Sequence, residues 1–413
     1  MARDEIIVGL DIGTTKVTCV IGERSEGGID IIGIGNARSE GLRKGVVVNI
    51  DSTVRAIRQA VEEAELMAGC SVVNVFTGIA GAHIKGLNSR GIVAIGKERE
   101  VSDADIERVI DAARAVAIPM DREIIHILPQ EYVIDDNDGV REPIGMSGVR
   151  LEVKVHMVTA QSTCVQNIIR CCNRANLNVQ AIALEQIASA EACLLEEEKE
   201  LGVAMVDIGG GTTDIAIFYN NAIVHTAVVP IGGQHVSADI AVGLRTPRAD
   251  AERIKMAHGC AAMSLVDPDE QIEVPGVAGR SQTRSRQMLC EIIEPRIEEI
   301  YTLVHQEIQR SGFEDLCASG IVLTGGASQM QGMVELAQEV LDMPVRLGKP
   351  ENVGGLVDVV KNPKYSTAVG LVAYGMKHQP VLQRSRKRSG GGGGGQSSAG
   401  LFTRIGEWFR KVI

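Results

Sequence analysis

Residues 206–214 read Val206-Asp-Ile-Gly-Gly-Gly-Thr-Thr-Asp214, and residues 9–16 read Gly9-Leu-Asp-Ile-Gly-Thr-Thr-Lys16. Both stretches contain Asp-Ile-Gly, then two further glycines or none, then Thr-Thr and a charged residue. Apolar, β-branched runs flank each stretch, which predicts two strands joined by a short Gly/Thr turn. An internal repeat of this kind predicts two related α/β domains that face each other.

A third glycine pair, Gly325-Gly326, follows the apolar run 321–324. Glycine lets the backbone approach an anion without a Cβ atom, so that consecutive N–H groups can point at phosphate oxygens. Threonine hydroxyls add donors, and a lysine ammonium suits the outer phosphates. Three such loops together favour a nucleotide site over three ordinary turns. The candidate phosphate-binding residues are Gly13, Thr14, Thr15, Lys16, Gly209, Gly210, Gly211, Thr212, Thr213, Gly325 and Gly326.

Two carboxylates stand at the ends of the predicted strands, Asp11 before the first turn and Asp207 before the second. Magnesium keeps several of its waters and takes few protein ligands. We therefore expect Asp11 and Asp207 to hold Mg²⁺, through water molecules.

The charge of the chain is uneven. The 413 residues, enough for two or three domains, carry a net charge of −11. Residues 381–413 hold seven basic residues and one acidic residue, so this segment is +6 and the remainder is −17. An acidic body argues against nucleic acid as the main partner. A basic end on an acidic body predicts contact with an anionic surface at that end.

The other compositional features predict a cytoplasmic protein. The nine cysteines show no metal-binding spacing, which is typical of buried thiols in a reducing compartment. The charged N-terminus does not resemble a signal peptide. No apolar run reaches the ~20 residues that a membrane-spanning helix needs.

The last thirteen residues, LFTRIGEWFRKVI, have the pattern of an amphipathic helix. Arginine and lysine lie opposite the apolar stripe, and three of the chain's eleven aromatic residues fall in this segment, including its one Trp. This combination predicts a helix in the interface of an anionic bilayer, with a protein groove as the alternative. The apolar stripe consists of Leu401, Phe402, Ile405, Trp408, Phe409, Val412 and Ile413.

Further elements are predicted along the chain. Helices are expected over 52–67 with Asp51 or Ser52 as N-cap, over 249–259, over 285–311 with an interruption at Pro295, and over 366–377. Short strands around a helix after Ser102 predict an inserted module at 84–160, in which 135–147 forms a loop. The basic, glycine-rich residues 381–400 predict a flexible linker.

The three glycine loops resemble the two phosphate motifs and the adenosine motif of the actin-like ATPases. The third motif is Ile321-Val-Leu-Thr-Gly-Gly-Ala-Ser328, which adds Ala327 to the site. The resemblance implies two duplicated RNase-H-like domains with ATP and Mg²⁺ in the cleft between them. It also implies nucleoside contacts from Glu252 and Lys255 in the run 251–255. Residues 183–190 resemble the superfamily's connecting helix, with Glu185-Gln186 where Glu-Pro is usual.

Four further segments resemble the bacterial cell-division members of this superfamily, namely residues 76–84, 198–203, 290–296 and 365–375. The resemblance covers essentially the whole chain. It implies a first RNase-H-like domain at 1–83, completed by 161–197 and 364–380, and an α+β insert at 84–160. A second RNase-H-like domain would span 198–363, with a nucleoside- and partner-binding subdomain at about 236–311, followed by the linker at 381–400 and the amphipathic helix at 401–413.

The same resemblance implies a function. The chain would polymerise with ATP, bind the C-terminal peptide of the tubulin-like FtsZ, with Arg296 as the candidate contact, and recruit later division proteins. It would lie on the cytoplasmic face of the inner membrane at the division site. The motifs explain ATP binding better than rapid hydrolysis, so we expect a slow ATPase at most.

A small-molecule kinase with the same ATP cleft is the alternative hypothesis. A kinase needs a catalytic carboxylate beside a substrate pocket, and no residue could be placed in that role. We therefore assign no catalytic residue from the sequence.

Overall fold

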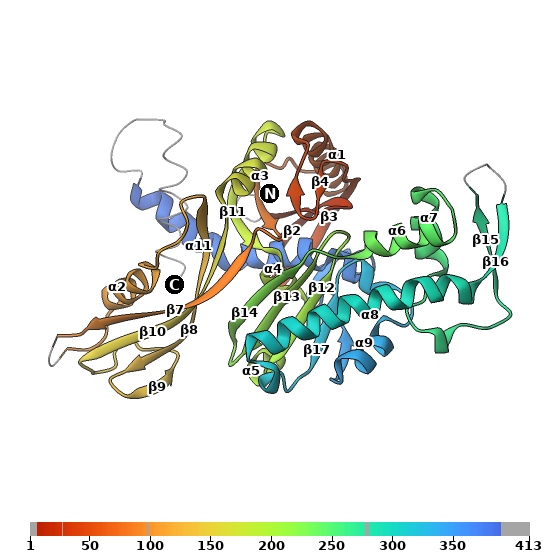
Figure 1. Cartoon of the computed structure of the whole chain (residues 1–413). Coiled ribbons are helices and arrows are strands. Elements are labelled where there is room, and N and C mark those ends of the chain that lie inside the picture. Colours follow the sequence, from red (N-terminus) through yellow and green to blue (C-terminus); the bar gives the residue numbers. More distant parts are fainter. Residues whose placement is uncertain (1–5, 27, 97–98, 277–280, 390–413) are drawn as a thin grey trace.

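The computed structural model describes residues 6–26, 28–96, 99–276 and 281–389. Two central sheets lie side by side, and a third, smaller sheet stands at one end of the molecule (Figure 1). The predicted amphipathic segment, with Leu401, Phe402, Ile405, Trp408, Phe409, Val412 and Ile413, lies outside the described residues.

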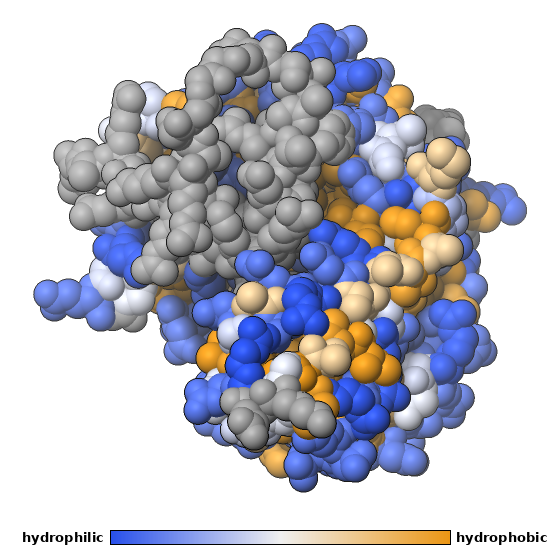
Figure 2. Space-filling model, turned by 90° about the vertical axis from the view of Figure 1, so that its left-hand side faces the viewer, coloured by the Kyte–Doolittle hydropathy of each residue, from blue (hydrophilic) through white to orange (hydrophobic). Residues whose placement is uncertain are grey.

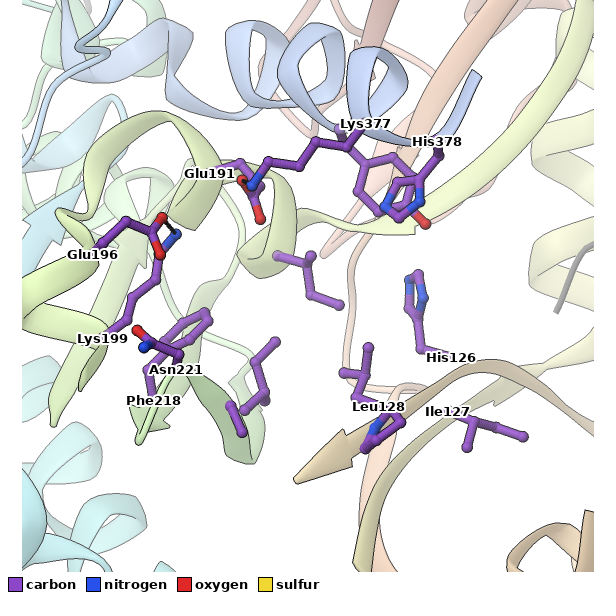
Figure 3. A pocket seen from close by; sticks show the side chains of 15 residues that line it. His126, Ile127, Leu128, Glu191, Glu196, Lys199, Phe218, Asn221, Lys377 and His378 are labelled. Atoms are coloured by element: carbon purple, nitrogen blue, oxygen red, sulfur yellow. Dashed lines mark hydrogen bonds and ion pairs between the residues drawn. The ribbon is translucent and has the colours of Figure 1, made fainter. Parts of the chain in front are cut away.

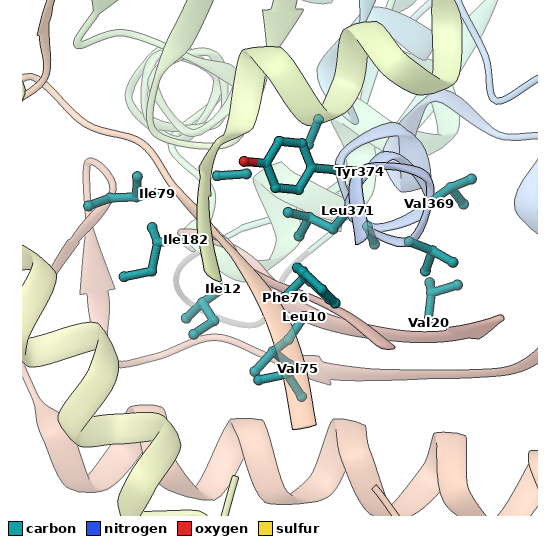
Figure 4. Packing of buried hydrophobic residues seen from close by; sticks show 14 of the residues in the cluster. Leu10, Ile12, Val20, Val75, Phe76, Ile79, Ile182, Val369, Leu371 and Tyr374 are labelled. Carbon is teal, nitrogen blue, oxygen red and sulfur yellow. The ribbon is translucent and has the colours of Figure 1, made fainter. Parts of the chain in front are cut away.

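The first central sheet has the strand order β11-β6-β1-β2-β3-β19. Helices α1, α3, α4 and α11 pack around it, and Figure 4 shows Phe76 of the sheet beside Tyr374 of α11, with their ring centroids 6.5 Å apart. The strands are β1 (Ile6–Ile12), β2 (Lys16–Ser25), β3 (Gly28–Arg38), β6 (Asn74–Ile79), β11 (Asn178–Leu184) and β19 (Val353–Gly355). The helices are α1 (Ile50–Ala68), α3 (Ser162–Arg174), α4 (Glu185–Cys193) and α11 (Ser366–Ser389).

The second central sheet repeats the design, with the order β14-β13-β12-β17-β18. In both sheets the first strand pairs antiparallel with the second and parallel with the fourth. The strands are β12 (Val203–Ile208), β13 (Thr213–Tyr219), β14 (Ala222–Val229), β17 (Ile321–Thr324) and β18 (Val345–Leu347). The accompanying helices are α5 (Glu196–Leu201), α6 (Gly233–Gly243), α7 (Arg248–His258), α8 (Arg286–Ser311) and α9 (Met333–Leu341). The duplication predicted from the repeat is therefore present in the topology.

The third sheet, with the order β7-β10-β8-β9, carries α2 on one face and has its own apolar core. Its elements are β7 (Lys85–Ala94), α2 (Asp103–Arg114), β8 (Arg122–Ile134), β9 (Asn137–Val140) and β10 (Arg150–Gln161). We call this part, residues 85–161, the insert. The smaller elements elsewhere are β4 (Leu42–Arg43), β5 (Val46–Val47), β15 (Gln271–Pro275), β16 (Ser281–Ser285) and α10 (Val357–Val360).

One arginine ties the two strands through which the chain enters and leaves the insert. The Arg122 Nη2 atom donates to the carbonyl oxygen of His83 at 2.9 Å and to that of Thr159 at 2.8 Å. His83 lies two residues before the start of the insert, and Thr159 is near the end of β10. A single guanidinium thus fixes the spacing of the two connections.

The insert also contacts β14, the outermost strand of the second sheet as described. Side-chain amides of the insert donate to its backbone, from Asn88 to the carbonyl of Val224 at 3.3 Å and from Gln130 to that of Ile223 at 3.2 Å. The ring of His156 lies between the Asn88 side chain, at 2.7 Å, and the Thr226 hydroxyl, at 2.9 Å. The contact between insert and second domain therefore includes a set of hydrogen-bonded polar groups.

Several predicted boundaries need correction. The N-cap of α1 is Asn49, rather than Asp51 or Ser52, because its side chain accepts the Ser52 N–H at 2.9 Å. Helix α8 continues through Pro295 without interruption, since buried Ile293 and Ile297 on either side offset the local cost of the proline. The predicted loop 135–147 contains the short strand β9.

The flexible linker predicted for 381–400 is wrong over 381–389, where α11 continues to Ser389. Leucine, glutamine, arginine and lysine are good helix formers, so a basic composition does not end a helix by itself.

No helix in the described ranges has both the length and the apolar character needed to cross a bilayer.

Candidate functional site

The two predicted phosphate loops have the same backbone geometry. In the first, Ile12 pairs with Val17, and the Gly13 N–H donates to the Lys16 carbonyl at 3.0 Å. In the second, Ile208 pairs with Thr213, and the Gly209 N–H donates to the Thr212 carbonyl at 3.0 Å. The two turns therefore have equal length.

This equality corrects the sequence alignment of the repeat. The second loop contains no insertion of two glycines, and the Thr-Thr pairs do not correspond. The strand pairing matches Asp11 with Thr18 and Asp207 with Asp214. Strand register is set by which faces of the strands are buried. Aligned by this register, Asp214 of the second motif corresponds to Thr18 of the first.

The two loops face each other in direct contact. A Cβ atom on Gly210 would stand 2.9 Å from the Thr15 hydroxyl oxygen, and one on Gly211 would stand 2.8 Å from that of Thr14. Both threonines belong to the first loop and both glycines to the second. The glycines are therefore required by the approach of the loops, as well as by any anion that they bind.

The third glycine loop closes against the second. Gly325 has a φ of +90°, and a Cβ atom there would overlap the Asp207 carboxylate and stand 2.6 Å from the Ile208 carbonyl oxygen. Gly326 is less confined, since the nearest atom to a Cβ there is 3.8 Å away. The methyl of Ala327 lies 3.1 Å from the ideal Cβ position of Gly233, the first residue of α6. The structure thus brings all three loops together.

Glu252 and Lys255 lie beside this junction on α7. The Lys255 Nζ atom donates to the Gly233 carbonyl at 3.0 Å, to the Ser237 hydroxyl at 3.0 Å and to Glu252 at 2.9 Å. The Gly233 N–H in turn donates to the carbonyl of Gly209 at 2.9 Å. Lys255 is therefore connected to the second phosphate loop through one residue.

Lys16 lies at the first loop but has intramolecular partners. Its Nζ atom donates to the Thr18 hydroxyl at 2.8 Å and to the carbonyl of Lys364, and it stands 4.8 Å from the centre of the Tyr365 ring. Burial lowers the pKa of this ammonium, and the nearby Asp11 opposes the shift. Two of its three N–H donors are thus used within the chain, which leaves one for a phosphate.

Four carboxyl groups gather between the loops, those of Asp11, Asp207, Asp214 and Glu185. Burial raises the pKa of all four, to about 6 for Asp11 and to about 8 for Asp214. Each of Asp11, Asp214 and Glu185 also feels repulsion from Asp207. The charge of Lys16 opposes this rise for Asp11, Asp207 and Glu185. The cluster favours the approach of a cation.

The positions of two of these carboxylates fit a hydrated magnesium ion. Asp207 accepts hydrogen bonds from Ser189 at 2.7 Å and Thr367 at 3.3 Å, which orient it from behind. The Oδ1 atom of buried Asp214 has no hydrogen-bond partner within the described residues. Within these same ranges, no three His, Cys, Asp or Glu side chains are placed to hold a metal directly. The unpartnered Asp214 oxygen can accept a hydrogen bond from a metal-bound water.

Four residues of this region were not predicted as site residues. Asp214 was visible as the last residue of the second motif, and Glu185 as part of the connecting helix. Ser189 and Thr367 carry no motif signal, since they come from α4 and α11 and reach Asp207 only in the folded chain.

Arg296 lies on α8, in a different setting. Its guanidinium bonds Asp239 of α6 through two nitrogens, at 2.5 and 3.1 Å, and also contacts Glu299. The hydrogen bond with Asp239 raises the pKa of Arg296. An acidic peptide would have to compete with two carboxylates of the chain itself.

The family models match two segments of the chain. "Cell division protein FtsA" matches residues 204–370, and "SHS2 domain inserted in FTSA" matches residues 81–159.

Solved structures support the fold at low sequence identity. The PilM–PilN type IV pilus biogenesis complex has a TM-score of 0.67 at 16% identity, covering 89% of this chain and 98% of the other. MreB5 of Spiroplasma citri bound to AMPPNP has a TM-score of 0.57 at 13% identity, covering 92% and 98%. The fold is therefore that of the actin-like ATPases, with an SHS2 insert.

Relatives extend over nearly the whole chain. The cell division protein FtsA of Pseudomonas aeruginosa is 58% identical, over 91% of this chain and 90% of that protein. FtsA of Neisseria meningitidis is 49% identical over 97% and 96%, and FtsA of Escherichia coli K12 is 41% identical over 98% of both chains. At this identity and coverage, the chain belongs to the FtsA family of bacterial cell-division proteins.

Proposed function

We propose that this protein binds ATP and Mg²⁺ in the cleft between its two duplicated domains, and that it polymerises in that state. The contact between the two phosphate loops carries this proposal. Thr14 and Thr15 of one domain meet Gly211 and Gly210 of the other, so a nucleotide held there is held by both domains at once. Nucleotide binding would thereby select one relative position of the domains.

The residues proposed to hold the nucleotide each have a distinct task. Backbone N–H groups of the loops at Gly13, Gly209 and Gly325 would receive the phosphates, and Lys255 and Glu252 would contact the nucleoside. Asp11 and Asp207 would hold Mg²⁺ through its waters, and the ion would supply positive charge for the phosphates. The Spiroplasma MreB5 structures contain ADP and AMPPNP in the same fold.

We further propose that the chain tethers FtsZ filaments to the inner membrane. Residues 401–413 would lie in the cytoplasmic face of the bilayer at the division site, and the α6–α8 region with Arg296 would bind the FtsZ C-terminal peptide. One short helix binds a membrane weakly, whereas a filament presents many helices together. Polymerisation is therefore what makes the tether firm.

The insert supports the proposed recruitment of later division proteins. It exposes large apolar side chains, among them Ile92, Ile144 and Val149, each more than half exposed. Figure 2, which faces this end of the molecule, shows apolar areas separated by hydrophilic ones. Apolar patches bordered by polar residues often mark protein-binding sites, which is why we propose this end for the recruitment. The alternative hypothesis, a small-molecule kinase, gains no support from the chain's membership of the FtsA family.

The test is electron microscopy of the purified chain on anionic lipid monolayers, with and without ATP. We expect filaments on the lipid only with ATP and only when residues 401–413 are present. Filaments on lipid from the chain lacking 401–413 would contradict the tether. A phosphorylated small-molecule product would contradict the structural role of the nucleotide.

A further inference from the structure

A cavity of about 320 Å³ lies where the insert, the first domain and the second domain meet (Figure 3). Strand β8 of the insert lines one side. Helices α4 and α11 of the first domain line another, and α5 with the β13–β14 turn completes the wall. None of the candidate nucleotide-binding residues lines the cavity.

Its lining combines an apolar floor with paired charges at the rim. Leu128, Ile187 and Phe218 contribute apolar surface. At the rim, Lys377 pairs with Glu191, and Lys199 pairs with Glu196 at 2.9 Å. Because these charges are already compensated, the cavity favours an apolar group over an ion. Its volume is at the low end of the roughly 300–1,000 Å³ of small-molecule sites, enough for an aromatic side chain.

The position of α11 indicates which group that is. Tyr374, Lys377 and His378 of α11 line the cavity, and the same chain continues past them to residue 413. From His378 the helix runs on to Ser389, about 16 Å at about 1.5 Å per residue. Residues 390–400, rich in glycine, would have a mean span of about 17–20 Å as a random coil. Residue 401 can therefore return to the cavity.

We infer that, away from a membrane, residues 401–413 dock at this cavity of their own chain with Trp408 inserted. The inference rests on the proposed membrane function, because the same apolar face of residues 401–413 would bind either the membrane or the cavity. Tryptophan buries about 150–250 Å² of surface, and no other Trp occurs in the chain. A linker of this length gives an effective concentration near the millimolar range, which favours the chain's own tail over a second copy.

Docking would have two consequences. It would hold the insert against both domains, because the cavity wall comes from all three. It would also reduce the apparent affinity for membranes by the fraction of undocked tails. An anionic bilayer would compete for Trp408 and so free the insert at the same time.

The single tryptophan makes this directly testable in the full-length chain without lipid. We expect Trp408 emission that is blue-shifted relative to a synthetic peptide of residues 401–413, and protected from acrylamide quenching. Both should be independent of protein concentration. Peptide-like emission would overturn the inference, and a blue shift that disappears on dilution would indicate docking on a second copy and overturn it too.

Two substitutions locate the docking site. Ala222→Arg places a long side chain in the cavity, and Leu128→Asp makes its floor polar. Each should shift the emission toward that of the peptide and raise acrylamide quenching several-fold, with circular dichroism confirming the fold. Ala104→Arg, on the exposed face of α2 away from the cavity, is the matched control and should change neither. Unchanged emission in both folded cavity variants would overturn the inference.

Titration with anionic vesicles of phosphatidylglycerol separates this inference from the proposed function. If docking is real, Ala222→Arg should bind the vesicles more tightly than the parent chain. If the parent binds vesicles but shows no protection in solution, the membrane function stands and the docking fails. If protection is present but vesicles never bind, the docking stands and the membrane function fails.

Discussion

Gly211 lies against Thr14 across the interdomain cleft, and a methyl group at position 211 would stand 2.8 Å from the Thr14 hydroxyl oxygen. The φ of Gly211 is outside the left-handed region, so alanine is conformationally allowed there. We predict that Gly211→Ala weakens ATP binding about 10-fold or more, because overpacking costs about 1–3 kcal/mol. Equilibrium binding of a fluorescent ATP analogue measures the change.

Thr14→Ala provides the control for this prediction. It removes the two nearer of the three Thr14 atoms that the new methyl would meet, so the Gly211→Ala, Thr14→Ala double variant should lose less affinity than the sum of the single variants. Strict additivity would show that the two loops do not constrain each other.

The raised pKa of the Asp214 carboxyl predicts that the stability of the folded chain depends on pH. Its pKa is raised to about 8 in the folded chain, mainly by burial, whereas an unfolded Asp titrates near 3.9. Between these values the folded state holds more protons, so stability falls as pH rises, by up to about 1.4 kcal/mol per pH unit. We expect the nucleotide-free chain to be less stable toward urea at pH 8 than at pH 7.

Asp214→Asn should flatten this slope, because the amide does not titrate. Glu185, whose pKa is also raised, would leave a smaller residual slope. An unchanged slope in Asp214→Asn would show that the carboxyl does not retain its proton.

If Arg296 binds the FtsZ C-terminal peptide, two substitutions should change the affinity for that peptide in opposite directions. Asp239→Asn removes the carboxylate that holds the guanidinium, and should strengthen binding of the FtsZ C-terminal peptide several-fold. Arg296→Ala should weaken binding by a similar factor or more. Fluorescence anisotropy with labelled peptide measures both, and equal losses in the two variants would mean that the Arg296–Asp239 pair only maintains the fold.

We predict that Arg122 stabilises the two connections to the insert. Arg122→Lys keeps the charge but loses the Nε donor to the Thr159 hydroxyl and the rigid placement of Nη2 between the His83 and Thr159 carbonyls, at a cost of about 1–3 kcal/mol. Hydrogen exchange should accelerate near residues 83–85 and 159–162. Arg141→Lys, at an exposed position of the insert, should leave exchange there unchanged, and a similar acceleration in both variants would refute the role of Arg122.

The parts of the site that could be predicted are those made of consecutive residues. The loops at Gly13, Gly209 and Gly325 are recognisable because each combines an apolar strand with a glycine turn. The correspondence between the loops was misread, because two glycines resemble an insertion until the pairing of Asp207 with Asp214 sets the register.

Other features depend on residues that are far apart in the chain. Ser189 and Thr367 converge on Asp207 from two helices, and no local pattern marks either one. The contact of His156 with Thr226 likewise depends on how the insert lies against β14. Such contacts follow from packing between elements, which local propensity does not encode.

The amides of Asn88 and Gln130 have a practical consequence for anyone shortening this chain. They occupy carbonyl oxygens of β14, the outermost strand of its sheet. Deleting residues 84–160 would leave that strand as an open edge, a surface on which extended segments of other chains can pair. A truncated protein made to study the ATP cleft alone should therefore aggregate, unless a charged or proline substitution is introduced along β14.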